Sequence, residues 1–218
     1  MTHPLATLPT EWVNPAVEGR NPIIVCQITR GVAPVFPIAE AQREADIGDA
    51  SYWLIAGYPA VEAKNRAVEH ALCAHKDLLL IEDDILAGAD IWRAMLTKGD
   101  SVRLATTNCR NGTPNTRYHR DGSVQSSGTV MVTIPYAVLI RLPQPIFVAN
   151  VYGLGTDGEM FLRGPCTNGR QSDTHLWFTI RQLDPRPEIQ VVGAVDHLMH
   201  SENSATWELQ KPSTWRVA

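Results

Sequence analysis

Three carboxylates directly follow an apolar stretch in the first half of the chain. Glu82, Asp83 and Asp84 come after residues 78–81, a run typical of a strand buried on both faces. Three acids at one strand end repel one another unless a positive charge lies among them. Mg²⁺ or Mn²⁺ suits such oxygen ligands and keeps coordination positions for water and substrate phosphate. The triplet therefore indicates a metal site; acids that face solvent or cap the next helix are the alternative.

The ends of other elements supply further candidates. Thr29 and Arg30 follow the first apolar strand pattern, where α/β proteins tend to bind ligands, so they could contact a nucleotide or form a plain turn. Ser172 and Asp173 precede an amphipathic segment, and either could be its N-cap. His197 follows the last strand pattern, and a structural histidine is its plain interpretation.

A long polar stretch, residues 107–127, has no apolar periodicity and is predicted to be a loop. It carries Arg110, Arg117 and Arg120 against the single acid Asp121. This excess of arginine favours a lid or an acceptor-facing loop that binds phosphates, with a plain solvated loop as the alternative.

The elements that must position these residues alternate between strand and helix patterns. Strands are predicted at 23–28, 52–56, 78–81, 102–106, 128–134 and 189–192. Helices are predicted at 38–45, 59–75, 89–96, 137–140 and 174–183. Strand, helix and strand in this order imply right-handed crossovers, so we expect an α/β fold with a mostly parallel central sheet flanked by helices.

The composition fits one globular domain. The chain has 218 residues, of which 44% are hydrophobic and 19% are charged, enough to bury a substantial core. A net charge of −4 gives no reason to expect indiscriminate nucleic-acid binding. No leader pattern and no long apolar run is present, so we expect a cytoplasmic protein without a membrane partner. We expect an irregular arm at 1–21, one domain at 22–200 and a tail at 201–218 packed on it.

Over residues 22–200 the chain resembles the GT-A-fold glycosyltransferases, which use nucleotide-sugar donors and a DxD-type acidic motif. The resemblance rests on IIVCQITR, on AKNRAVEHAL leading into LLLIEDDI, on SGTVMVTI followed by YAVLIRL, on SDTHLWFTI and on VDHLMH. It implies a single GT-A-like, Rossmann-like domain. It also implies a nucleoside-diphosphate sugar as donor, with UDP as the expected nucleotide, and Mn²⁺ or Mg²⁺ as cofactor.

The resemblance also implies roles for individual donor-site residues. Lys64 and Asn65 stand where the family has a basic residue and an asparagine that serve the donor site. Asp84 would bind the metal together with His197, with His200 in reserve. Glu82 or Asp83 would hold the ribose or a metal-bound water.

Asp173 matches the family's second carboxylate motif. In an inverting reaction it would be the general base, and in a retaining reaction it would position the sugar. The glycines at 153, 155 and 158 spell a dinucleotide-binding pattern, but they follow a proline-bounded stretch and no clear helix comes after them. We therefore interpret them as part of a second irregular stretch, 143–158.

For both the acceptor and the reaction class, the sequence leaves more than one interpretation open. The small size resembles that of bacteriophage-type glycosyltransferases, some of which modify hydroxymethylated DNA bases. Together with the arginine-rich loop, this favours a hydroxymethylated base in DNA as acceptor, and a saccharide or protein hydroxyl stays open. A Mg²⁺-dependent phosphoryl-transfer enzyme or nuclease, and a non-enzymatic nucleotide- or DNA-binding module, are the alternatives from other classes.

Overall fold

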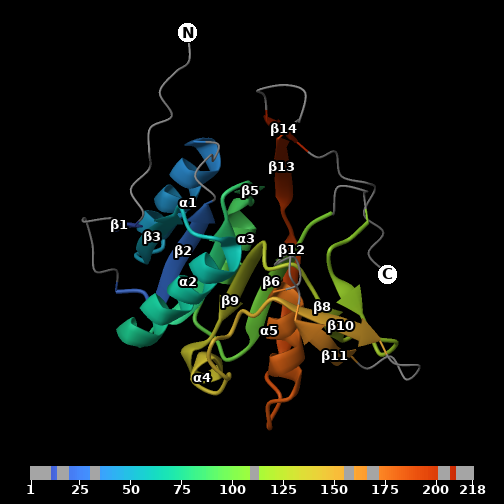
Figure 1. Ribbon diagram of the computed structural model, residues 1–218. Helices are drawn as coiled ribbons and strands as arrows, with labels where there is room; N and C mark the ends of the chain where they lie inside the picture. Colours follow the sequence, from blue (N-terminus) through green and yellow to red (C-terminus); the bar gives the residue numbers. More distant parts are fainter. Residues whose placement is uncertain are drawn as a thin grey trace.

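The central sheet has the strand order β1-β3-β2-β4-β9-β6-β12 (Figure 1). The structure is a computed structural model that describes residues 11–13, 20–29, 35–108, 113–154, 160–165, 172–200 and 207–209. The strands are β1 (Glu11–Val13), β2 (Ile23–Thr29), β3 (Ser51–Ala56), β4 (Asp77–Glu82), β6 (Val102–Thr106), β9 (Met131–Ile134) and β12 (Ile189–Ala194).

Five of the seven strands in this sheet run in the same direction. β3, β2 and β4 are mutually parallel, and β12 is parallel to β6. β9 runs antiparallel between β4 and β6, and β1 runs antiparallel to β3 at the edge. The predicted α/β fold with a mostly parallel sheet is therefore confirmed. β1 lies within the segment predicted to be an irregular arm, so that prediction is wrong for residues 11–13.

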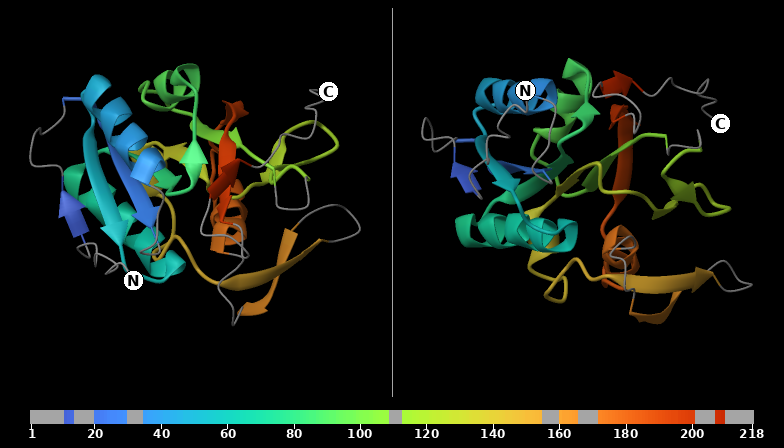
Figure 2. Two further views of the ribbon diagram at one scale, coloured as in Figure 1. Left: turned by 90° about the horizontal axis from the view of Figure 1, so that it is seen from above. Right: turned by 45° about the horizontal axis from the view of Figure 1, so that its top comes forward.

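Helices cover both faces of the sheet (Figure 2). α2 (Ala60–Ala74), α4 (Tyr136–Leu139) and α5 (Ser172–Arg181) pack on one face, and α1 (Val35–Ile47) and α3 (Ala89–Met95) pack on the other. Residues 78–81 of β4 are all apolar because both faces of the strand are buried. Leu78 and Leu80 belong to one core cluster and Leu79 and Ile81 to the other, all fully buried. Each contributes about 1.5–3 kcal/mol by leaving water.

Three small sheets extend from this layer structure. β5 (Ile85–Leu86), β13 (Asp196–His200) and β14 (Trp207–Leu209) form one; β7 (Arg117–Tyr118) and β8 (Val124–Ser126) form a hairpin; β10 (Asn150–Leu154) and β11 (Met160–Pro165) form another. The two stretches predicted to be irregular, 107–127 and 143–158, thus contain strands. Both residues of β7 are exposed and β8 starts with two buried residues, so neither strand alternates between buried and exposed positions. β14 places part of the tail against β13.

Among the described residues, no helix has the length and apolar character needed to cross a membrane.

Candidate functional site

The predicted site lies at the carboxyl edge of the parallel strands. β3, the strand after β2 in the chain, pairs with one edge of β2, and the next strand, β4, pairs with its other edge. The strand order therefore reverses between β2 and β4. Ligands of open α/β sheets bind at such a switch point. Thr29 ends β2 and is buried, and Glu82 ends β4 opposite Ile28.

A buried ammonium group organises the acids on the α2 side of this edge. Pro59 precedes α2, and small residues at positions 63, 67 and 71 let the helix lie close to the sheet. Lys64 shares that buried face. Its Nζ lies 2.6 Å from Asp173 Oδ1, 2.7 Å from Thr129 Oγ1 and 3.2 Å from Glu82 Oε1. The three N–H donors of the ammonium group thus meet three acceptors.

Thr129 completes this arrangement, which we call the Lys64 cluster (Lys64, Glu82, Thr129 and Asp173). The Thr129 hydroxyl donates to Asp173 Oδ1 at 2.7 Å, and the Thr129 amide donates to Asp173 Oδ2 at 3.2 Å. Asp173 lies in the first turn of α5, with its carboxylate toward α2 and the segment before β9. It therefore joins three elements, and the capping alternative is wrong for Asp173.

Electrostatics differ between the two acids of the cluster. Burial raises the pKa of Asp173, but the charge of Lys64 and hydrogen bonds from Lys64 and Thr129 outweigh it, so the pKa lies below its ordinary value. Burial raises the pKa of Glu82, and Asp173 and Asp84 raise it further against the opposing effect of Lys64. For Lys64, burial lowers the pKa, but the two acids outweigh it and raise the pKa overall. Lys64 and Asp173 therefore form an ion pair at neutral pH.

The low pKa bears on the predicted role of Asp173. A general base works best when its pKa lies near the operating pH. A carboxylate held by a lysine, a hydroxyl and an amide is a weak base. An ionised Asp173 is therefore better suited to accept a hydrogen bond than to remove a proton.

A second pair of side chains lies beside the cluster. The chain turns after β4, and β13 crosses β5 so that the Leu198 amide donates to the Asp84 carbonyl at 2.7 Å. His197 Nε2 then lies 2.8 Å from Asp84 Oδ2. The side chains of Asp84 and His197 are each about one-fifth exposed to solvent. The Asp84 Oδ1 atom itself is buried and has no hydrogen-bond partner among the described residues. The structure thus brings together the two predicted metal ligands.

The spacing of this Asp84–His197 pair fits two ligands of one small divalent ion. Neighbouring ligands of an octahedral Mg²⁺ ion at about 2.1 Å lie about 3 Å apart, close to the observed separation of 2.8 Å. The buried, unpartnered Asp84 oxygen also fits a cation site. Among the described residues, no group of three or more His, Cys, Asp or Glu side chains could hold a metal. Water and substrate would therefore have to supply the remaining ligands.

Asn65 has a different position from its neighbour Lys64. Its side-chain amide donates to the Phe147 carbonyl at 2.9 Å and accepts from the Phe147 amide at 2.9 Å. The Phe147 ring lies under the Lys64 ammonium, 5.7 Å from Nζ to the ring centroid. Asn65 thus holds the segment after α4 against α2 and supports the Lys64 cluster indirectly.

The remaining predicted residues lie in the turn after β4, on the β7–β8 hairpin or outside the described ranges. Asp83 lies in the turn between β4 and β5, and Arg117 and Arg120 are exposed on the β7–β8 hairpin. Arg30, Arg110 and the His200 side chain lie outside the described parts of the chain.

Sequence reasoning missed Thr129, which is fully buried. Its only signal is a threonine just before an antiparallel strand, a common pattern in sheets. It also missed Gln27, which accepts from the Tyr52 hydroxyl at 2.6 Å and whose amide lies 3.5 Å from the Glu82 carbonyl.

Comparison with known proteins identifies a fold but no family. No protein-family model and no curated protein matches the sequence. Among solved structures, the chain is similar to the crystal structure of A197 from STIV, with a TM-score of 0.55 and 13% sequence identity. The alignment covers 90% of this chain and 97% of A197. At this identity the similarity shows a shared fold, and the fold extends over nearly all of both chains.

Proposed function

We propose that this chain is a metal-dependent glycosyltransferase that transfers a sugar from a nucleoside-diphosphate sugar to an acceptor hydroxyl. The observation that carries the proposal is the Asp84–His197 pair, 2.8 Å apart at the carboxyl edge of a mostly parallel sheet. The strand order reverses at this edge, where nucleotides commonly bind. The order of the sequence motifs, which resembles that of GT-A-fold enzymes and includes the motifs of Asp84 and His197, also supports the proposal.

The charge balance of the site supports a cation there. Glu82, Asp84 and Asp173 contribute three carboxylates against one lysine ammonium. A nucleoside diphosphate alone would be repelled by this excess. Mn²⁺ or Mg²⁺ held by Asp84 and His197 would neutralise it and, when bound, would stabilise the charge on the departing diphosphate.

The side chains of the Lys64 cluster have positioning roles in this proposal. Lys64 fixes Asp173, whose ionised carboxylate would accept a hydrogen bond from a sugar hydroxyl. Glu82, with about a quarter of its side chain exposed, faces the same space and would contact the ribose. Thr29, at the end of β2, lies where the nucleotide would enter the switch point.

Calorimetric titration of nucleoside diphosphates, with UDP first, tests the proposal. The titrations use the wild type, Asp84→Ala and Asp90→Ala, each with and without Mn²⁺. Asp90 is a matched control because it is an acid on α3 with 92% of its side chain exposed. We expect Mn²⁺-dependent UDP binding in the wild type and in Asp90→Ala, and its loss in Asp84→Ala.

The other outcomes separate the competing classes. Absence of nucleotide binding with and without Mn²⁺ would overturn the glycosyltransferase proposal. Mn²⁺ binding without nucleotide binding, together with cleavage of a DNA substrate, would favour a nuclease. A bound nucleotide with slow hydrolysis of the UDP-sugar would support glycosyl transfer, because many transferases lose the sugar to water when no acceptor is present.

A further inference from the structure

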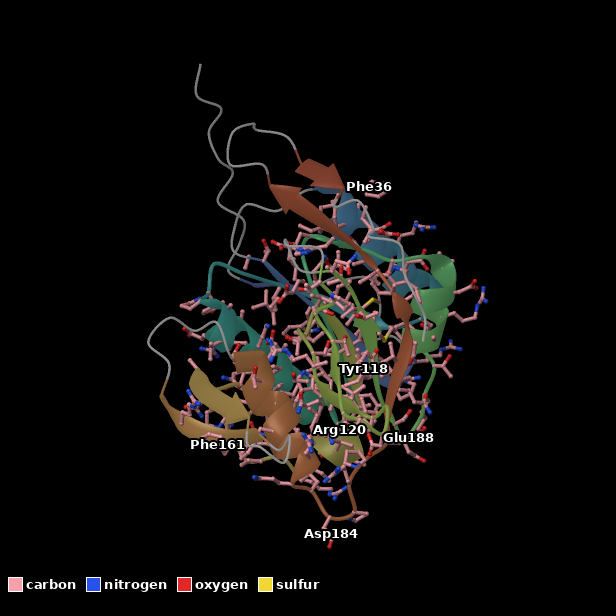
Figure 3. The ribbon with its side chains drawn as sticks, turned by 90° about the vertical axis from the view of Figure 1, so that its right-hand side faces the viewer. Phe36, Tyr118, Arg120, Phe161, Asp184 and Glu188 are labelled. Carbon is pink, nitrogen blue, oxygen red and sulfur yellow. The ribbon has the colours of Figure 1, made fainter. Side chains whose placement is uncertain are left out.

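Among the described residues, the two most exposed large apolar side chains lie on one helix, α1. Phe36 is 66% exposed and Ile47 is 68% exposed. Figure 3 labels Phe36 near the upper end of the molecule, far from Asp184 at the lower end. α1 packs on the face of the sheet opposite α2 and α5, which carry Lys64 and Asp173. The two apolar side chains therefore lie outside the candidate site.

Phe36 and Ile47 lie on the same side of α1. They are three helical turns apart, about 16 Å along the helix axis. Ala39 and Arg43 lie between them on this side and are also exposed. The opposite side of the helix enters the core through the fully buried Ala41. The outer side of a surface helix normally carries polar residues, so packing within one chain does not account for the two large apolar ones.

Two opposite charges lie in the middle of this side. Glu40 and Arg43 follow Phe36 at the spacing of one and two turns, and Ile47 follows at three. The Arg43 side chain is 63% exposed, although its Nη2 lies 2.5 Å from Glu44 Oε1. A guanidinium group has five N–H donors, so Arg43 has donors for a second carboxylate. We call residues 36, 39, 40, 43 and 47 the α1 face.

The α1 face is complementary to its own reverse. A two-fold axis between positions 41 and 42 places a second α1 antiparallel on the first. Phe36 then faces the partner's Ile47, and Glu40 faces the partner's Arg43. The symmetry repeats each contact, so two apolar contacts flank two ion pairs. A parallel arrangement would oppose Glu40 to the partner's Glu40 and Arg43 to the partner's Arg43, which like-charge repulsion disfavours.

We propose that the α1 face is a dimerisation surface, on which α1 of a second copy of this chain packs antiparallel. The same face supplies both halves of every contact, which favours a second copy over an unrelated partner. α1 has 13 residues and is about 20 Å long, so the buried area falls at the low end of specific interfaces, below about 1,200 Å². We therefore expect a reversible dimer with a micromolar dissociation constant. The proposal does not depend on the proposed function.

Sedimentation velocity of the full chain, from micromolar to millimolar concentration, tests the proposal. We expect the wild type to change from monomer to dimer over this range. Phe36→Ala and Ile47→Ala should each weaken dimerisation about 10- to 100-fold, because every dimer loses the contact twice. Ile140→Ala is the matched control, since Ile140 is 57% exposed at the end of α4 on the other face of the sheet. It should dimerise like the wild type.

Exchanging the two charges tests the antiparallel register. Glu40→Arg and Arg43→Glu should each weaken self-association about 10-fold or more, because each opposes like charges across the axis. The two single variants mixed together should dimerise with each other, since every arginine then faces a glutamate. The double variant Glu40→Arg/Arg43→Glu should also recover dimerisation. Arg66→Glu, at an exposed arginine of α2, is the charge control and should leave dimerisation unchanged.

Four outcomes would overturn the proposal. They are a wild type that stays monomeric up to millimolar concentration, a dimer that both apolar variants leave intact, charge variants that do not associate when mixed, and a monomer that binds anionic phospholipid vesicles through Ile47. The apolar variants remove exposed side chains, so an unchanged melting temperature in dilute solution would show that they are folded. Loss of nucleoside-diphosphate binding in a chain that still dimerises would overturn the proposed function alone.

Discussion

The Lys64 cluster and the Asp84–His197 pair lie side by side at one edge of the sheet, yet they are built differently. In the cluster, the lysine ammonium meets three acceptors, and both Asp173 oxygens accept hydrogen bonds. In the pair, one oxygen of Asp84 is buried and has no hydrogen-bond partner within the described chain. The cluster is satisfied by the protein itself, and the pair is not.

This difference indicates separate tasks. A satisfied network of buried charges rigidifies the elements that it joins, here α2, the end of β4, the start of β9 and α5. An unsatisfied buried carboxylate oxygen costs free energy in the absence of a ligand, and a bound cation recovers that cost. We therefore expect substitutions in the cluster to act on stability, and substitutions in the pair to act on metal response.

The largest effect should come from Lys64→Met. Methionine has a similar length but leaves Asp173, Glu82 and Thr129 without their shared donor. Breaking a buried ion pair typically costs about 3–5 kcal/mol. We expect a loss of about 3 kcal/mol in the unfolding free energy, at the lower end of this range. The side chains of both acids are about one-quarter exposed, so water can still solvate them. Urea unfolding measures this loss.

Lys98→Met is the control for Lys64→Met, because Lys98 is exposed after α3. It should change the unfolding free energy by less than about 0.5 kcal/mol. A Lys64→Met protein as stable as Lys98→Met would show that the cluster contributes nothing to the fold, and the contrast between the two regions would fail.

Mn²⁺ should stabilise the wild type through the Asp84–His197 pair. At a concentration 100 times the dissociation constant, a ligand that binds only the folded state adds about 2.7 kcal/mol. Asp84→Asn should remove this gain while leaving the metal-free stability within about 1 kcal/mol of the wild type. Thermal melts with and without Mn²⁺ measure both quantities. An equal Mn²⁺ gain in wild type and variant would place the metal elsewhere.

The two acids of the cluster should respond to pH in opposite directions. The folded-state pKa of Asp173 is lowered, so its stabilisation is present above the ordinary pKa and is lost as the pH falls through the folded value. Asp173→Asn should therefore cost about 2 kcal/mol at pH 7, the range for a hydrogen bond to a charged group, and progressively less in acid.

The contribution of Glu82 to stability changes with pH in the opposite direction. Its folded-state pKa is raised, so its contribution is fully present below the ordinary pKa and is lost as the pH rises through the folded value. Glu82→Gln, which mimics the neutral acid, should be at least as stable as the wild type at pH 7 and should lose this advantage in acid. Chemical unfolding between pH 3 and pH 8 compares the variants. The same sign for both acids would contradict the assignment.

Much of the fold could be predicted because its central strands are buried on both faces. β2 begins with four apolar residues and β4 has four in its middle, and α2 shows apolar residues at helical spacing. The hairpins escaped prediction for the opposite reason. Both residues of β7 are exposed, so neither helical nor strand periodicity marks them. β1 is only three residues long and pairs at the edge of the sheet.

Only the charged residues and the histidine of the candidate site could be predicted from the sequence. Glu82 and Asp84 follow an apolar strand, and His197, 113 residues later in the chain than Asp84, was assigned through the family resemblance. The Lys64–Asp173 contact spans 109 residues, and no local pattern indicates such a pair. Thr129 is uncharged and neighbours no motif, so its role comes only from the folded arrangement.

Thr129 offers the smallest and most specific test of the cluster. Thr129→Val keeps the shape but removes the hydroxyl between Lys64 and Asp173, and we expect a cost of about 1 kcal/mol because the Thr129 amide and Lys64 still hold the carboxylate. Thr129→Ser keeps the hydroxyl and loses a buried methyl group, which costs about 0.8 kcal/mol. Stability therefore cannot separate the two variants.

The pKa of Asp173 separates the two variants because, of the hydroxyl and the methyl group of Thr129, only the hydroxyl favours the ionised carboxylate. In Thr129→Val that bond is lost, so the Asp173 pKa should rise toward its ordinary value, whereas in Thr129→Ser it should stay at the wild-type value. Carboxyl-carbon NMR titration measures this pKa directly in all three proteins. A pKa that is unchanged in Thr129→Val would mean that Lys64 and the Thr129 amide hold Asp173 ionised without the hydroxyl, and that the threonine side chain only fills space beside the ion pair.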